Sequence, residues 1–195
     1  MKLFVGALLA AIVVFLWGAL SWMVLGWHDN QIRGFDSEED VAEVIRENAG
    51  SGQARYMLPY LGEVPSFLHP QEKEAREAAV TEARDEGPFM YALIRPGKKP
   101  FSMPQAMAWS FVRAFVAALI VGWILTPLSF PYGKKVAVAA AMGAFASITA
   151  HVPDWIWFEM TGGELAVHMA DRLFEWMLAG LVLALFVGQP EVAER

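Results

Sequence analysis

Residues 3–27 read LFVGALLAAIVVFLWGALSWMVLGW, a run that contains no charged residue. This run exceeds the roughly 20 apolar residues that a helix needs to cross a bilayer. The apolar core of a secretory signal peptide is shorter, about 7 to 15 residues, and ends in a small-residue cleavage site. Here the run ends in a series of tryptophans instead, as a membrane anchor does. It predicts an uncleaved transmembrane helix over residues 1–27.

Three more apolar runs follow, over residues 106–130, 136–158 and 167–187. The composition agrees with a membrane protein, because 56% of the residues are hydrophobic and eight are tryptophan. We therefore expect an all-α membrane protein with four transmembrane helices: one over residues 1–27, and three within residues 105–188. A small α+β segment over residues 28–104 would separate the first helix from the second.

The basic residues predict the orientation. Lys134 and Lys135 lie in the short turn between the second and third runs, and short loops rich in Lys and Arg stay in the cytoplasm. With four spans, both termini are then cytoplasmic, including the tail at residues 189–195, and residues 28–104 are periplasmic.

The periplasmic segment is expected to contain two helices and two strands. Ser37 precedes an acidic stretch with helical apolar spacing, and residues 69–87 read as a polar helix with Pro70 in its first turn and Gly87 past its end. ARYMLPY (54–60) and PFMYALIR (88–95) are expected to pair as short antiparallel strands. About 75 residues are marginal for an independent domain, so the segment is expected to lean on the membrane helices or on a partner.

Several function classes have no support in the sequence. The net charge is −6 and no basic patch is interleaved with aromatic residues, so nucleic-acid binding is not expected. The chain has no cysteine, which excludes disulfides and thiolate chemistry. It has no phosphate-binding loop, nucleophile elbow or HExxH motif, which argues against an enzyme. No cofactor is required, although a transition metal held by His and carboxylate ligands is compatible with the sequence.

Ionisable residues inside the predicted spans form the candidate site. Arg113 in the second span and Glu175 in the fourth lie at a similar predicted depth, roughly 12 to 15 Å from the outer side, so they are expected to meet. His168, Arg172 and Glu175 share one helix face, with Asp171 beside it. The predicted polar cluster consists of Arg113, His151, Asp154, His168, Asp171, Arg172 and Glu175.

This cluster has three interpretations. In the first, which the charge balance favours, two arginines and three carboxylates neutralise one another and hold the helices together. In the second, the cluster carries ions or protons, as intramembrane ionisable residues often do. In the third, the two His-x-x-Asp pairs, His151 with Asp154 and His168 with Asp171, supply four ligands to a zinc, iron or copper ion. The proximity of Arg172 argues against a bound cation.

Small residues predict close helix packing in the third span. Ala139, Gly143, Ser147 and His151 recur every four residues and form a strip that lets another helix approach closely. Pro153 removes a backbone hydrogen bond, which predicts a kink near Asp154 at the end of this span.

The tryptophans are expected to anchor the outer membrane interface, where the indole ring is favoured. Their number on one side also suggests extra contact with lipids or with a partner. The predicted anchors are Trp17, Trp22, Trp27, Trp109, Trp155, Trp157 and Trp176.

The stretch FLWGALSWMVLGWHDNQIRGFDSEEDVAEVI (15–45), together with RYMLPY and PFMYALIRPG, resembles small bacterial inner-membrane proteins of unknown function. In these proteins a first span ending in Trp-His is followed by an acidic helix and short Tyr- and Pro-containing stretches. The resemblance covers roughly the first half of the chain. It implies an inner-membrane location and no particular activity.

The sequence thus favours a non-catalytic accessory, assembly or stabilising subunit of a larger inner-membrane complex. Its expected partners are membrane lipids and other integral membrane subunits. The alternative is a protein that handles ions or protons, or binds a metal, through the polar cluster. In that mechanism His151 and His168 would exchange protons with the outside.

Overall fold

The computed structural model describes residues 1–60, 69–98 and 100–188. The predicted tail at 189–195 lies outside these residues. Over the described residues the fold is mostly helical, with six α-helices and one two-stranded sheet. The chain divides into two compact units: Met1–Arg33 with Phe101–Arg195, and Gly34–Pro100. We call them the helical unit and the inserted unit.

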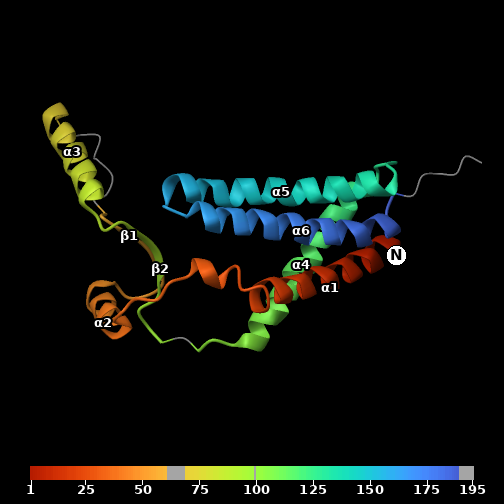
Figure 1. Cartoon of the computed structure of the whole chain (residues 1–195), viewed down its shortest axis with the longest axis horizontal. Coiled ribbons are helices and arrows are strands. Elements are labelled where there is room, and N and C mark those ends of the chain that lie inside the picture. Colours follow the sequence, from red (N-terminus) through yellow and green to blue (C-terminus); the bar gives the residue numbers. More distant parts are fainter. Residues whose placement is uncertain (61–68, 99, 189–195) are drawn as a thin grey trace, which may run out of the picture. The chain divides into compact units, whose positions relative to one another are not determined.

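The helical unit contains four long helices (Figure 1). They are α1 (Lys2–Met23), α4 (Met103–Leu125), α5 (Tyr132–Trp157) and α6 (Gly162–Phe186), with a short 3₁₀ turn, η1 (Asp29–Gln31), after α1. Helix α6 packs along α5 on one side and against α1 on the other, and α1 also packs against α4. α6 therefore lies between α5 and α1.

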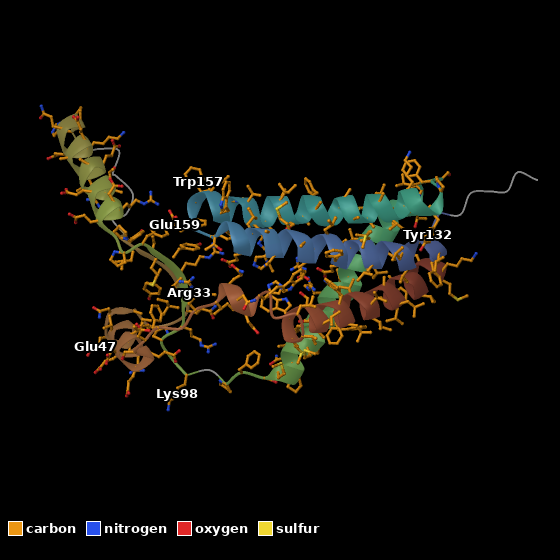
Figure 2. All side chains as sticks on the ribbon, viewed as in Figure 1. Arg33, Glu47, Lys98, Tyr132, Trp157 and Glu159 are labelled. Atoms are coloured by element: carbon orange, nitrogen blue, oxygen red, sulfur yellow. The ribbon has the colours of Figure 1, made fainter. Side chains whose placement is uncertain are left out.

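The ends of these helices are fixed by local hydrogen bonds. The Ser102 hydroxyl accepts the backbone N–H of Gln105 at the start of α4, and the Thr161 hydroxyl accepts that of Glu164 at the start of α6. Helix α5 continues past Pro153 as far as Trp157, with Figure 2 labelling Tyr132 and Trp157 at its two ends.

Successive helices run in opposite directions. At one end of the unit, Gly188, which follows α6, lies close to the carbonyl oxygens of Leu125, the last residue of α4, and of Leu128 just beyond it. At the other end, the side chain of Gln31 after α1 lies against Gly163 at the start of α6. The helices thus form an up-and-down arrangement. The chain leaves α1 for the inserted unit at the same end of the bundle as the α5–α6 turn.

Small side chains fill the interior of the helical unit, and large apolar ones cover its surface. Ala7, Ala118 and Ala139 are fully buried, whereas the exposed face of α1 carries leucines. Water-soluble proteins rarely expose so continuous an apolar surface. Among the described residues, three helices are long and apolar enough to cross a membrane: α1, α4 and α5. This pattern is that of a membrane protein.

Helix α6 has the length of a span but not the composition. Its middle carries Asp171, Arg172 and Glu175, and every 18-residue stretch of the helix includes all three. The four-span prediction therefore exceeds the three apolar helices of the structure by one.

The inserted unit contains α2 (Glu38–Asn48), α3 (Pro70–Glu86) and the sheet of β1 (Ala54–Leu58) with β2 (Met90–Ile94). The two strands are antiparallel, with Ala54 opposite Ile94 and Leu58 opposite Met90. The predicted helices and the predicted strand pairing are confirmed, and Gly87 follows α3 as expected. Among the described residues of this unit none is fully buried, as the side chains around Glu47 on α2 illustrate (Figure 2).

Candidate functional site

Glu175 on α6 binds two arginines. Arg113 from α4 donates to its Oε1 at 3.2 Å, and Arg172, one turn earlier on α6, donates to its Oε2. The Glu175 side chain is 4% exposed, whereas that of Arg113 is 54% exposed. The structure thus brings Arg113 and Glu175 together, and the carboxylate has both oxygens occupied by cations.

Asp171 on α6 is bound by two side chains of the α1 region. The Trp17 indole N–H donates to its Oδ1 at 2.8 Å, and His28 Nε2 lies 3.7 Å from its Oδ2. Asp171 and His28 are both buried. The two neighbouring carboxylates of α6 thus connect α6 to different helices, Glu175 to α4 and Asp171 to α1.

His28 belongs to this site although it is not part of the predicted cluster. Its ring is buried and stacks on Trp22, with ring centroids 3.9 Å apart. Its Nε2 also lies 3.2 Å from the Ser21 hydroxyl, which accepts the Trp27 indole N–H at 3.0 Å. His28 follows α1 in a turn, so no helical spacing in the sequence relates it to Asp171.

Three histidine rings form a row across the site. The rings of His151 on α5 and His168 on α6 stack with centroids 4.3 Å apart, and the His168 and His28 centroids are 5.4 Å apart. His168 Nε2 also lies 3.9 Å from the Glu164 carboxylate one turn earlier. The row leads from α5, through α6, to His28 and Asp171.

The four predicted metal ligands do not share one arrangement. His151 and His168 stack face to face, while Asp171 is bound by Trp17 and His28. Asp154 lies on the last turn of α5. Among the residues that the structure describes, no group of three or more His, Asp or Glu is placed to hold a metal ion.

The predicted tryptophan anchors occupy different environments. Trp22, Trp109, Trp155 and Trp157 are exposed, as the anchor role requires. Trp176 differs from its predicted place: it is 8% exposed and packs in the core against the strip of small residues on α5. Trp17 and Trp27 use their indole N–H groups inside the polar site.

The strip of small residues forms the contact between α5 and α6. Ala139, Gly143 and Ser147 are buried there. A Cβ added to Gly143 would lie 2.6 Å from the backbone oxygen of Arg172 and 2.7 Å from Trp176 Cβ. The close approach at Gly143 therefore positions the segment of α6 that carries the charged residues.

Lys135 has a structural role that the sequence did not reveal. Its ammonium group is buried and donates to the carbonyls of Val187 and Gly188 at the end of α6. Lys134 is exposed, and its ammonium lies 4.0 Å from the centre of the Phe130 ring. One of the two lysines that predict the orientation is thus a helix cap as well.

A pocket of about 470 Å³ opens beside the charged groups, between α1, α4 and α6. Its walls are apolar and include Phe15, Trp22 and Met107. Arg113, Asp171, Arg172 and Glu175 form its polar side. A volume of this size falls within the range of small-molecule binding sites.

These observations define the class as a mostly helical protein with three helices, among the described residues, long and apolar enough to span a membrane, and with a polar cluster between its helices. Comparison with known proteins adds no relative, since no protein-family description, curated protein or solved structure matches the chain.

Proposed function

We propose that the protein is a four-span inner-membrane protein that acts as a non-catalytic accessory, assembly or stabilising subunit of a larger membrane complex. The fourth span is α6, whose 25 residues extend about 37 Å at 1.5 Å per residue. Its acidic groups are buried and paired with arginine, tryptophan and histidine, so they do not face lipid. Intramembrane charges are tolerated in such an arrangement.

The proposed orientation places both termini in the cytoplasm and the inserted unit in the periplasm. The up-and-down order of the helices supports the placement of both termini on one side, because an even number of spans returns the chain to its starting side. The choice of the cytoplasmic side rests on Lys134 and Lys135. Positive charge acts during insertion, so the later use of Lys135 as a cap is compatible with that role.

The observation that carries the accessory role is the lack of an interior in the inserted unit. Among its described residues none is fully buried, and its sheet has only two strands, which are marginally stable alone. Large apolar side chains stand exposed on it. They are Phe35, Val44, Leu58, Tyr60 and Leu93. We propose that the periplasmic part of another integral membrane protein covers this surface.

Native mass spectrometry of protein gently extracted from its own membrane tests this role. The expected result is a defined hetero-assembly of fixed stoichiometry that dissociates when Leu93→Asp places a charge on the exposed face of β2. The matched control is Thr81→Asp, which places the same charge on α3, where polar side chains already predominate. A lone chain or a homo-oligomer, or an assembly indifferent to Leu93→Asp, contradicts the proposal.

The row of histidines favours a second candidate function, transfer of protons through the cluster. The rings of His151, His168 and His28 follow one another at centroid distances of 4.3 and 5.4 Å, so transfer between them would need bridging water, and His28 ends the row at Asp171. Against this role, Asp171 and Glu175 are already occupied by protein donors. Their pairing supports a structural role for the carboxylates.

Substitution within the row separates the two candidates. Proton uptake by purified protein in sealed vesicles carrying a pH-sensitive dye is expected to equal that of empty vesicles. If uptake exceeds the empty-vesicle rate and is lost in His168→Phe, which keeps a ring to stack on His151, the proton function replaces the accessory one. His69→Phe on the inserted unit is the control for a histidine outside the row.

A further inference from the structure

The pocket between α1, α4 and α6 offers free hydrogen-bond donors from two arginines. Both oxygens of Glu175 accept from arginines, and the two oxygens of Asp171 face Trp17 and His28. Each carboxylate oxygen thus already faces a protein group. Each guanidinium has five N–H donors, and among the described residues Arg113 and Arg172 each make a hydrogen bond to Glu175 alone. The unused capacity of the two guanidinium groups consists of donors only, and the Ser110 hydroxyl on the pocket wall can donate as well as accept.

The charges of the polar side are balanced. Arg113 and Arg172 contribute two positive charges, and Asp171 and Glu175 contribute two negative ones. An anion would add an unmatched charge in a low-dielectric region, whereas a neutral acceptor would not. The ligand that fits this balance is uncharged and presents oxygen acceptors to the guanidinium groups.

The walls select a flat, apolar body. Phe15 and Trp22 present aromatic rings, and Met103 and Met107 present flexible thioethers that adapt to the shape of a ligand. The pocket begins at the last turn of α1 and the first turn of α4 and extends to Arg113. Arg113 lies ten residues into α4, a distance of about 15 Å at 1.5 Å per residue. A ligand that reaches Arg113 must therefore dissolve in the hydrocarbon region of the membrane.

We propose that this pocket binds a neutral, membrane-soluble ring carbonyl compound with an apolar tail, that is, a compound of the quinone class. Its carbonyl oxygens accept hydrogen bonds from Arg113 and Arg172, and its ring lies between the aromatic and thioether walls. The tail leaves the pocket into lipid. This binding needs no partner protein, so it holds or fails independently of the accessory role.

The test measures equilibrium binding of a radiolabelled ubiquinone analogue with a ten-carbon tail to purified protein in phosphatidylcholine nanodiscs, with empty nanodiscs subtracted. We expect saturable binding of about one ligand per chain. Arg113→Met, which removes the donors, is expected to raise Kd at least tenfold. Met107→Trp, which fills the pocket and leaves the ion pairs intact, is expected to do the same. Val116→Trp, on the exposed face of α4, serves as the matched control and is expected to leave Kd unchanged.

Two results overturn the proposal. One is the absence of saturable binding, or binding that Arg113→Met and Met107→Trp both leave unchanged. The other is displacement of the quinone analogue by phosphatidylglycerol but not by the same excess of phosphatidylcholine, which identifies an anionic lipid headgroup as the occupant. Where Arg113→Met fails to fold, as judged by its thermal unfolding, Met107→Trp alone decides.

Discussion

We expect Glu175 to be more important for stability than its partner Arg113. It is almost fully buried between two guanidinium groups, whereas Arg113 is half exposed and Arg172 neutralises Glu175 without it. We expect Glu175→Ala to lower the free energy of unfolding by about 3–5 kcal/mol, the usual cost of breaking a buried ion pair. For Arg113→Ala we expect a smaller loss, because Arg172 still neutralises Glu175.

Thermal unfolding in detergent compares these variants. The double variant Arg113→Ala/Glu175→Ala should be more stable than Glu175→Ala, because one of the two unmatched guanidinium groups is gone. A larger loss of stability for Arg113→Ala than for Glu175→Ala would contradict this prediction and show that Arg113 contributes more to stability than Glu175.

Gly143 permits the closest approach between α5 and α6. A methyl group there meets a backbone oxygen, which cannot rotate away, so Gly143→Ala should cost about 1–3 kcal/mol. Gly133→Ala on the same helix has no neighbour within 4 Å and is expected to be neutral or stabilising by up to about 1 kcal/mol. Thermal unfolding compares the two variants. Equal stabilities would mean that α5 and α6 can move apart at Gly143 without a loss of stability.

For single residues, the sequence predicts those contacts between side chains whose positions follow from counting along regular helices. Arg113 and Glu175 were expected to meet because each could be placed at a depth by counting residues along a straight helix. The role of His28 was not predicted because it depends on the path of the turn after α1, and that of Lys135 because it depends on where the end of α6 lies, neither of which can be derived from hydropathy. Trp176 was assigned to the interface from its position in the span, whereas the helix face that it occupies turns it inward.

Among the elements, α6 depends on a contact with the first turn of α5. Lys135 binds the carbonyls of Val187 and Gly188 at the end of α6, so Lys135→Met should leave the buried Val187 carbonyl and the partly buried Gly188 carbonyl without this donor and lower stability by about 1–3 kcal/mol. Hydrogen exchange should increase at the end of α6 before it does so elsewhere. Lys134→Met removes an exposed charge of the same turn and should cost less than about 1 kcal/mol. Equal rates of hydrogen exchange at the end of α6 in the two variants would contradict the capping role of Lys135.

The same helix shows where composition misleads. The short strands of the inserted unit could be predicted because aromatic and aliphatic residues gather between turn-forming residues. Helix α6 was predicted as a span from its apolar second half. Its charged middle does not meet a strict apolarity criterion, and only tertiary contacts show that these charges face α1, α4 and one another rather than lipid.

For the whole molecule, the native chain lacks cysteine, so single cysteines report the side of the membrane without background. We expect Ser51→Cys in the inserted unit and Glu159→Cys in the α5–α6 turn to react with a membrane-impermeant maleimide that is added to cells whose inner membrane is intact. Gly133→Cys and a cysteine added after residue 195 should react only once the membrane is opened. Reaction of the added cysteine from outside would place α6 on the surface of the membrane rather than across it.

The position of α6 in the chain determines the order of assembly during synthesis. Of the four long helices it leaves the ribosome last, when α1, α4 and α5 are already made. In the proposed four-span arrangement its ionisable residues, each costing about 2.5–3.5 kcal/mol to insert alone, then find Trp17, His28 and Arg113 in place. A truncated chain that ends before α6 would lack the carboxylate that pairs with Arg113.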